Sequence, residues 1–268
     1  SSSLLSAYEN ILIPQKLMMA GQSVDDAMIV FGNLTGMALP LIQLPSSFLM
    51  AISTTLVPAL SATQATGSVA RSAYVADKSI KFTTISGLCF TGVFMLFPHE
   101  ICRIIYSNGD IGDILLKLAV ICPFLYLHIT LSGILNGLGC HSLIFKLSLL
   151  TSSINLSFIY FLMPKMGIDA FIIGMTISLI TAVSISIHNI NKIINLNFSF
   201  LRNFFVPLLC TLVSLFAVRF IMLGKNLNVH TVLLYIALFC VIYSALLLAS
   251  GVVSKSDISA VTATLTRK

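Results

Sequence analysis

Glu9 and Lys16 are two opposite charges seven residues apart in an otherwise apolar stretch of the chain. Seven residues make nearly two turns of an α-helix, so both side chains would lie on one face, about 10 Å apart. Asn10 and Gln15 add hydrogen-bonding groups nearby, and Pro14 can bend the helix toward its neighbours. Such a stripe can contact an ion, a proton or a polar headgroup. Alternatively, Glu9 makes a structural hydrogen bond and Lys16 extends to the nearest polar boundary.

The segments around this stripe carry very little charge. Residues 27–70 contain no Asp, Glu, Lys or Arg, and these types make up 9% of the chain, against about 25% in a typical soluble domain. The mean hydropathy is +1.01. A spanning helix needs about 20 apolar residues, and the apolar runs are continuous rather than alternating, which favours helices over a barrel. The sequence therefore predicts an all-α integral membrane protein in a lipid bilayer.

Eight transmembrane helices fit the apolar segments. The first ends near Leu17, and the others are expected at 33–62, 81–98, 113–138, 143–163, 168–190, 202–222 and 229–253. The more polar residues 254–268 are expected to leave the membrane. Because residues 1–5 already read as the interior of a helix, without a signal peptide, we expect the beginning of a larger protein to be missing.

Lys and Arg residues are distributed unequally between the two sets of connections. If the first helix ends outside, the outside connections carry Arg103, Lys165, Arg219 and Lys225. The inside segments then carry Arg71, Lys78, Lys81, Lys146, Lys192, Arg202, Lys255, Arg267 and Lys268. Positive residues accumulate on the cytoplasmic side of membrane proteins. The asymmetry predicts a multi-pass protein of the cell membrane with a cytoplasmic C-terminus.

The second expected helix contains three prolines. Pro40, Pro45 and Pro58 lie within it, and Gln43 lies between the first two. Each interior proline removes a backbone hydrogen bond, and in lipid the carbonyl that loses its donor needs a protein or water partner. We expect an interrupted helix that faces a wet cavity or a moving interface, as in many transporters. A kinked but static helix is the alternative.

Two pairs of glycines allow close approach between helices. Gly32 and Gly36 are four residues apart, as are Gly133 and Gly137. Small residues at this spacing let two helix backbones come together in a membrane.

No pattern in the chain indicates an enzyme or a cofactor site. The G-x-x-x-x-G-K-[ST], H-E-x-x-H and G-x-S-x-G patterns are absent. The six cysteines form no C-x-x-C pair and are expected to be small apolar core residues, so no metal site is predicted. The net charge of +6 is not arranged as a stripe of basic and aromatic residues, so nucleic acid is not an expected partner.

Several segments, in their order along the chain, resemble the stage V sporulation protein B family. They are 9–17 (ENILIPQKL), 32–40 (GNLTGMALP) and 56–61 (LVPALS), followed by shorter matches at 79–81, 97–106, 133–139 and 164–168. That family belongs to the multidrug/oligosaccharidyl-lipid/polysaccharide exporter superfamily. Its members have fourteen helices: two lobes of six, and two more at the end.

The resemblance implies that this chain corresponds to helices seven to fourteen. Residues 1–195 would form the second six-helix lobe, 196–253 the two additional helices, and 254–268 a cytoplasmic tail. The missing N-terminal lobe would then be a partner of this one. Related flippases carry a basic residue in the eighth helix, whereas 33–62 has no Arg or Lys. Lys16 is thus the obvious cavity cation of this lobe.

The function implied by the resemblance is transport of a lipid-linked glycan across the cytoplasmic membrane. The substrate would be a peptidoglycan or polysaccharide precursor, moved by alternating access in spore cortex or cell-wall synthesis. A substrate or ion cavity is expected to involve Glu9, Asn10, Gln15, Lys16 and Gln43, with helix breaks or gates at Pro14, Pro40, Pro45 and Pro58. Two alternatives are a cation-coupled drug or metabolite antiporter of the same superfamily, and a membrane scaffold for cell-wall enzymes.

Overall fold

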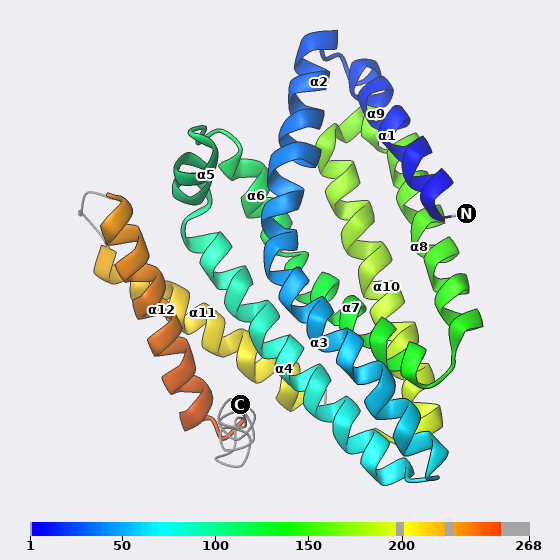
Figure 1. The fold of residues 1–268 in the computed structure, drawn as a ribbon. Helices are drawn as coiled ribbons and strands as arrows, with labels where there is room; N and C mark the ends of the chain where they lie inside the picture. Colours follow the sequence, from blue (N-terminus) through cyan, green and yellow to red (C-terminus); the bar gives the residue numbers. More distant parts are fainter. Residues whose placement is uncertain (1, 197–200, 223–227, 253–268) are drawn as a thin grey trace.

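The computed structural model describes residues 2–196, 201–222 and 228–252, and the predicted tail at 254–268 lies outside them. Within these residues every regular element is a helix and there is no strand, which confirms the all-α membrane architecture (Figure 1). The side chains of residues 2–7, 10, 65 and 201 are likewise outside the description.

The helices follow one another with short connections. In order they are α1 (Ser2–Met19), α2 (Val24–Gly32), the π-helix η1 (Asn33–Ala38), α3 (Leu39–Ala65), α4 (Val69–Leu96), α5 (Pro98–Tyr106), α6 (Gly112–Ala119), α7 (Cys122–Gly137), α8 (His141–Phe161), α9 (Met163–Met166), α10 (Ile168–Ile194), the π-helix η2 (Leu201–Phe205), α11 (Val206–Met222) and α12 (Val229–Ala249).

Six helical stretches among the described residues are long and apolar enough to cross a membrane. The second expected span is longer than predicted, because α2, η1 and α3 form one helical stretch over Val24–Gln64. The segment 113–138, expected as one span, consists of two helices, α6 and α7, whose axes differ by 54°. Counted together, these two helices would be a seventh span. Pro123, in the first turn of α7, cannot donate a backbone hydrogen bond to the preceding turn. The 18-residue α1 is not among these stretches, so the count of eight stays a prediction.

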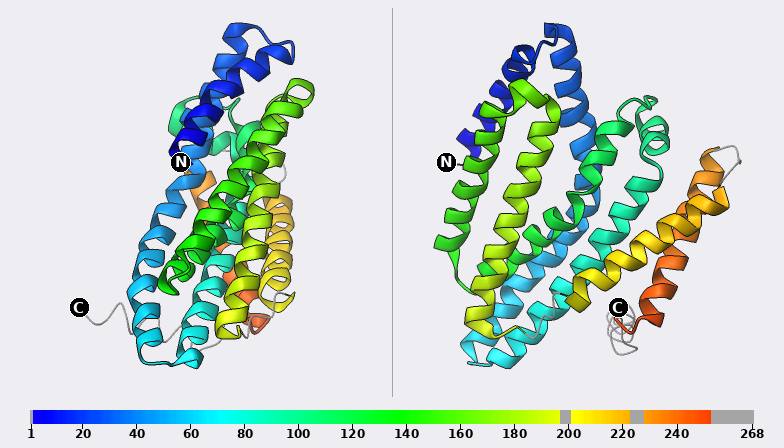
Figure 2. Two further views of the ribbon diagram at one scale, coloured as in Figure 1. Left: turned by 90° about the vertical axis from the view of Figure 1, so that its right-hand side faces the viewer. Right: turned by 180° about the vertical axis from the view of Figure 1, so that it is seen from behind.

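Helix α7 lies at the centre of the bundle and packs against α3, α4 and α10. Most of its side chains are buried, including Tyr126, Leu131 and Ile134. Thr130 of α7 and Thr83 of α4 share a hydrogen bond of 2.7 Å between their hydroxyl oxygens, both buried. In the view turned by 90°, α2 and α3 run along one edge of the bundle and α8 and α10 along the other (Figure 2). The central helix therefore sets the position of α3.

The close approach predicted for Gly133 and Gly137 is confirmed at the α3–α7 contact. A Cβ atom on Gly133 would lie 2.0 Å from the Ser53 Oγ, and one on Gly137 would lie 2.8 Å from the Leu60 Cβ. Three polar side chains of α3 also donate to carbonyls within α7 or directly after it: Ser53 to Ile129 (3.1 Å), Ser61 to Gly137 (3.2 Å) and Gln64 to Leu138 (3.4 Å).

The other pair of glycines is not a helix contact within the described residues. A Cβ atom on Gly32 or on Gly36 would meet no atom within 4 Å. Both pairs have the four-residue spacing. Within the described residues, only Gly133 and Gly137 lie against a neighbouring helix.

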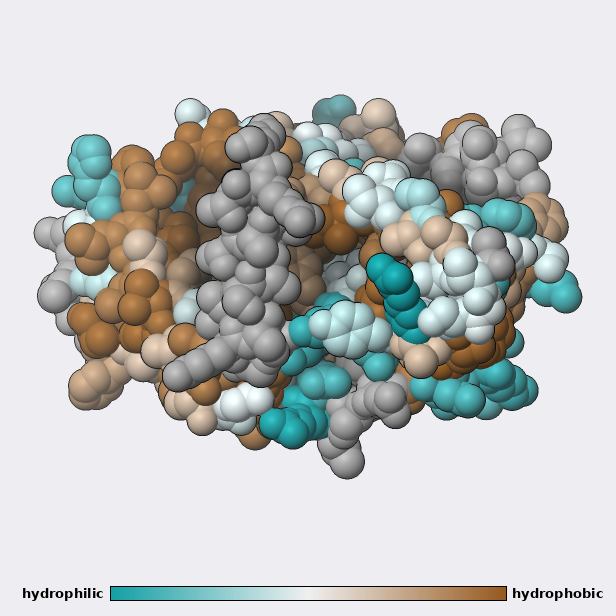
Figure 3. Space-filling view, turned by 60° about the horizontal axis from the view of Figure 1, so that its bottom comes forward, coloured by the Kyte–Doolittle hydropathy of each residue, from teal (hydrophilic) through white to brown (hydrophobic). Residues whose placement is uncertain are grey.

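The two sets of connections lie at opposite ends of the bundle (Figure 1). One end of the bundle holds the α3–α4 turn, the α7–α8 turn and the last residues of α10. It carries six basic residues, Arg71, Lys78, Lys81, Lys146, Lys192 and Arg202. Among the described residues of this end there is one carboxylate, Asp77. Hydrophilic residues gather on this face between areas of hydrophobic surface (Figure 3). The fold thus brings the predicted inside segments together, as their alternation along the chain requires.

Helices α11 and α12 pack on each other and on α4. A Cβ atom on Gly92 of α4 would lie 2.2 Å from the ring of Phe239, which stacks on Tyr243. The Tyr243 hydroxyl donates to the Ile85 carbonyl at 3.0 Å. The division at 195/196 into a lobe and an additional pair stays a prediction.

Candidate functional site

The predicted polar stripe of α1 has different surroundings at its two ends. Leu12, Ile13 and Leu17 are buried and hold α1 in the bundle, next to α8 and α9. Glu9 is half-buried, and Gln15 is exposed. Neither the Glu9 carboxylate nor the Gln15 amide has a hydrogen-bond partner in the described part of the chain.

Lys16 points to α8. Its ammonium group lies 3.9 Å from the centroid of the Tyr160 ring, within the range of a cation–π interaction. Lys16 thus has an aromatic partner that its sequence neighbours did not indicate. The side chain of Asn10, the remaining member of the predicted stripe, is outside the description.

The helices continue through the prolines instead of breaking at them. Helix α1 extends through Pro14, and α3 extends through Pro45 and Pro58, with Pro40 in its first turn. The prediction of an interrupted second helix is therefore wrong at the level of secondary structure. The six-residue π-helix η1 directly precedes this region, and such segments are common at functional sites.

Two tyrosine hydroxyls donate to backbone carbonyls close to Pro40 and Pro45. Tyr106, the last residue of α5, donates to the Met37 carbonyl at 3.2 Å, and Tyr126 of α7 donates to the Ile42 carbonyl at 2.8 Å. Each acceptor lies three residues before a proline, whereas the carbonyls that lose a backbone donor lie four residues before it, at Gly36 and Leu41. The tyrosines therefore join this helical stretch to α5 and α7 beside Pro40 and Pro45, but they do not replace the missing donors.

One exposed face of α3 carries three polar side chains around the exposed Met50. Gln43, Ser47 and Thr54 are exposed and lie four and seven residues apart, so they share a side of the helix. The neighbouring side carries Leu44 and Phe48, which are 65% and 64% exposed. We call the first of these sides the Gln43 face.

The polar groups of the Gln43 face differ in whether they have a hydrogen-bond partner. Ser47 and Thr54 donate to carbonyls of their own helix, at 3.2 and 2.8 Å, which Ser and Thr also do in lipid. The Gln43 amide has no partner within the described residues. Leaving an amide in hydrocarbon without a hydrogen bond costs roughly 2–7 kcal/mol. This face therefore requires water or another polar surface beside Gln43.

The predicted site residues do not converge on one enclosed pocket. Helix α1 packs beside α8, whereas α3 packs beside α7 and α4. A hollow of about 290 Å³ lies elsewhere, between the α3–α4 connection and the end of α10, and is lined by Thr63, Gln64, Gly67, Val69, Ser72, Ile193 and Ile194. Glu9 and Gln43 are thus surface groups of this chain on separate helices.

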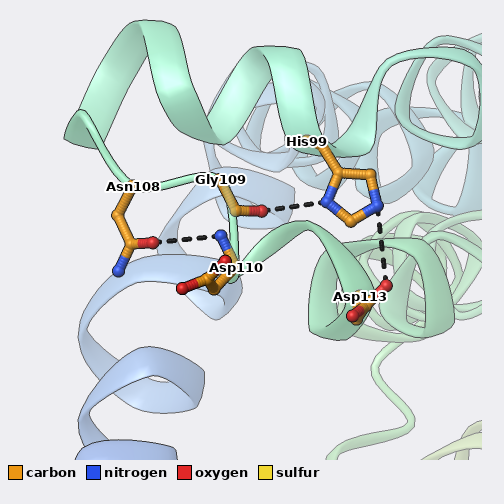
Figure 4. A network of polar contacts seen from close by, with 5 residues as sticks. All are labelled: His99, Asn108, Gly109, Asp110 and Asp113. Atoms are coloured by element: carbon orange, nitrogen blue, oxygen red, sulfur yellow. Dashed lines mark hydrogen bonds and ion pairs between the residues drawn. The ribbon is translucent and has the colours of Figure 1, made fainter.

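A separate polar network orders the connection between α5 and α6 (Figure 4). The His99 Nδ1 donates to the Gly109 carbonyl at 2.9 Å, so Nδ1 carries the proton. The His99 Nε2 lies 3.5 Å from a carboxylate oxygen of Asp113. In the same turn the backbone N–H of Asp110 donates to the Asn108 side chain at 3.0 Å. These contacts fix the orientation of α6 relative to α5.

Sequence patterns did not reveal the tyrosine partners of α3. Tyr126 lies 84 residues from its acceptor and Tyr106 lies 69 residues from its own, so neither pairing is a local signal. A tyrosine within an apolar segment still indicates that a buried hydroxyl needs an acceptor. That signal could have identified Tyr126, although not the carbonyl it serves.

The fold and these polar surfaces define a multi-pass helical membrane protein. The chain is similar to stage V sporulation protein B of Bacillus subtilis (strain 168), with 23% identity over 256 residues. That match covers 94% of this chain and 49% of the relative, so the chain spans about half the length of the curated relative it matches. The resemblance indicated by the short motifs is therefore confirmed across almost the whole chain. No protein-family profile matches the chain, and no solved structure matches it.

Proposed function

We propose that this chain is part of a transporter that moves a lipid-linked glycan precursor across the cytoplasmic membrane by alternating access. The similarity to stage V sporulation protein B supports a role in spore cortex or cell-wall synthesis. The proposed substrate is a peptidoglycan or polysaccharide precursor on a lipid carrier. The chain acts without a cofactor and without an enzymatic step of its own.

The observation that carries this proposal is the exposed Gln43 amide on a long, apolar, proline-containing helix. Its energetic cost in lipid supports a wet path along the Gln43 face, where hydroxyl and amide groups of a glycan can exchange hydrogen bonds with water. The π-helix, Pro40 and Pro45 lie on the same helical stretch. They provide positions where α3 can bend between an inward-facing and an outward-facing state.

The partner of this face is a second lobe of similar size, which the relative's length accommodates. In this arrangement the Gln43 face and the polar end of α1 face the space between the two lobes. The basic end of the bundle is cytoplasmic, because Lys and Arg accumulate on that side. The C-terminus then lies in the cytoplasm.

Translocation of a labelled lipid-linked glycan in reconstituted vesicles tests this proposal. We expect Gln43→Leu and Glu9→Gln to slow translocation several-fold at unchanged protein levels. Leu44→Ala is the matched control on the neighbouring side of α3 and should transport normally. Unchanged translocation in Gln43→Leu and Glu9→Gln would remove these residues from the mechanism. No translocation by the unaltered protein would support a scaffold instead.

Glu9 favours a second candidate, a cation-coupled antiporter. Carboxylates within membrane helices commonly bind a proton or metal cation during transport, and this one has no hydrogen-bond partner within the described chain. In an antiporter, Glu9→Gln would abolish exchange of a soluble substrate against a cation gradient. A flippase would show no such exchange in the unaltered protein.

A further inference from the structure

The central helix α7 is buried over most of its surface and accessible along one side. The side chains of α7 that are not buried are three polar ones, His128, Ser132 and Asn136, and three apolar ones, Phe124, Leu125 and Ile129. The polar residues are spaced four apart, so they follow one another along the helix. We call His128, Ser132 and Asn136 the α7 stripe. None of them belongs to the transport path proposed from α1 and α3.

Several polar groups of the α7 stripe have no partner. The His128 Nδ1 is buried and makes no hydrogen bond to any described residue. The Ser132 hydroxyl also makes none within the described part of the chain. The Asn136 Oδ1 accepts from the His141 Nδ1 at 3.1 Å, which leaves the N–H groups of its amide available. Because polar groups in an apolar environment are unfavourable without hydrogen bonds, the stripe requires water or a polar ligand beside it.

The α7 stripe lies on the side of α7 that is turned away from α4. Thr130 marks the side that faces α4, because its hydroxyl shares a hydrogen bond with Thr83. Ser132 follows two residues later, which is about 200° around the axis of an α-helix. His128 and Asn136 lie one turn before and one turn after Ser132, so the whole stripe is on this far side.

The Gln43 face of α3 is turned away from α4 as well. Thr63 marks the side of α3 that faces α4, because its Oγ1 lies 2.6 Å from the Ser72 Oγ of α4. Thr54, which belongs to the Gln43 face, lies nine residues before Thr63. Nine residues make about two and a half helical turns, so Thr54 is on the opposite side of α3.

A hydrogen bond joins α3 and α7 between these two surfaces. The Ser53 hydroxyl donates to the Ile129 carbonyl at 3.1 Å. Thr54 follows Ser53 in the sequence, and His128 precedes Ile129. The Gln43 face and the α7 stripe are therefore neighbours across the α3–α7 contact, on the side away from α4.

The chemistry of this combined surface favours sugars over phosphate groups. Neither α3 nor α7 contains lysine or arginine, the residues that bind phosphate best. The hydroxyl, amide and imidazole side chains present instead can both donate and accept hydrogen bonds. Sugar hydroxyl groups also donate and accept, so they can pair with each of these side chains.

We propose that the α7 stripe and the Gln43 face together bind the sugar portion of the lipid-linked glycan, and not its phosphate groups. The inference rests on the proposed function for the identity of the ligand. It adds binding residues on the central helix, and sugar hydroxyl groups supply the partners that His128 and Ser132 lack.

Thermal unfolding of the intact protein in a neutral detergent tests this site without requiring transport. The probes are a polyprenyl pyrophosphate that carries a disaccharide and the same lipid without sugars. In His128→Phe/Ser132→Ala, the disaccharide-lipid concentration that gives half the rise in melting temperature should increase at least about fivefold, since each hydrogen bond contributes roughly 2–10-fold. The half-point for the sugar-free lipid should not change. Thr130→Val, on the opposite side of α7, is the matched control and should keep both half-points.

Ser132→Ala alone separates a lost contact from a damaged fold. It removes a hydroxyl without a partner in the described chain, and should raise the half-point for the disaccharide lipid roughly 2–10-fold. Half-points equal to those of Thr130→Val would overturn the site. An equal increase for the sugar-free lipid would assign the stripe to a phosphate group and would overturn the preference for sugars. Absence of any stabilisation of the unaltered protein by the disaccharide lipid would contradict it too.

The outcome for this site can be told apart from the outcome for transport. Sugar-dependent binding through the α7 stripe, in a protein that moves no glycan lipid in vesicles, would contradict the proposed function alone. Translocation by the unaltered protein, with unchanged half-points in both stripe variants, would contradict the sugar site alone.

Discussion

Replacing Gly133 by alanine tests the close contact between α3 and α7, on which the position of the Gln43 face depends. The new Cβ would lie 2.0 Å from the Ser53 Oγ and 2.9 Å from the Ser53 backbone oxygen. The hydroxyl can rotate away, but the backbone oxygen cannot, so the two helices must separate. The hydrogen bond from Ser53 to the Ile129 carbonyl is then weakened or lost.

The same substitution at Gly32 is the matched control, because a Cβ there would meet no atom within 4 Å. Both variants gain the same helix propensity, so their difference isolates the packing cost. Overpacking costs about 1–3 kcal/mol, and a hydrogen bond between membrane helices contributes on average about 0.6 kcal/mol. We therefore expect Gly133→Ala to be less stable than Gly32→Ala by roughly 1.6–3.6 kcal/mol.

Reversible unfolding in mixed detergent micelles measures this difference. Ser53→Ala should partly rescue Gly133→Ala, because it removes the nearest atom but leaves the backbone oxygen. Equal stability of Gly133→Ala and Gly32→Ala would refute the close α3–α7 contact.

Three further changes have defined outcomes. Tyr126→Phe removes the hydroxyl that donates to α3 and should lower the free energy of unfolding by about 0.6–1.7 kcal/mol. Tyr160→Phe keeps the ring beside Lys16 and should leave the free energy of unfolding unchanged. Equal losses in the two variants would contradict a stabilising hydrogen bond from Tyr126 to α3. Gly112→Ala places a Cβ 2.3 Å from the His99 Nδ1 and should lower the melting temperature; an unchanged value would argue against the ordered α5–α6 connection. Burial raises the pKa of the Cys102 thiol, outside the long spans, to about 11, so the stability gained by keeping this thiol neutral falls as the pH rises from its ordinary pKa to about 11. The free energy of unfolding should therefore fall more between pH 9 and about pH 11 in the unaltered protein than in Cys102→Ala, and an equal fall in both would contradict the raised pKa.

Much of the fold could be predicted because the bilayer restricts a spanning chain to few structures. Long uncharged segments had to be helices, since backbone groups in lipid must pair within their own segment. Gly133 and Gly137 also indicated a close helix contact correctly. The bend between α6 and α7 was missed, because hydropathy alone does not distinguish a straight span from two helices joined at 54°.

The candidate site was predictable in its residue types but not in its arrangement. The position of Gln43 between two prolines indicated a polar site in α3, and its side chain is exposed there. Spacing along one helix could not show that Lys16 would lie over Tyr160 of α8. It also could not show that Tyr126 would donate to the Ile42 carbonyl of α3. Such contacts depend on which helices become neighbours.

Cysteine accessibility along α3 tests most directly whether the Gln43 face lines the route of a lipid-linked glycan. Ser47→Cys and Phe48→Cys are placed in the intact protein after its six native cysteines are replaced by alanine. A membrane-impermeant maleimide should modify the cysteine at 47 and not the one at 48, and an added lipid-linked glycan should protect position 47. Equal modification at both positions, or modification at 47 that the glycan lipid leaves unchanged, would contradict a transport path along this face.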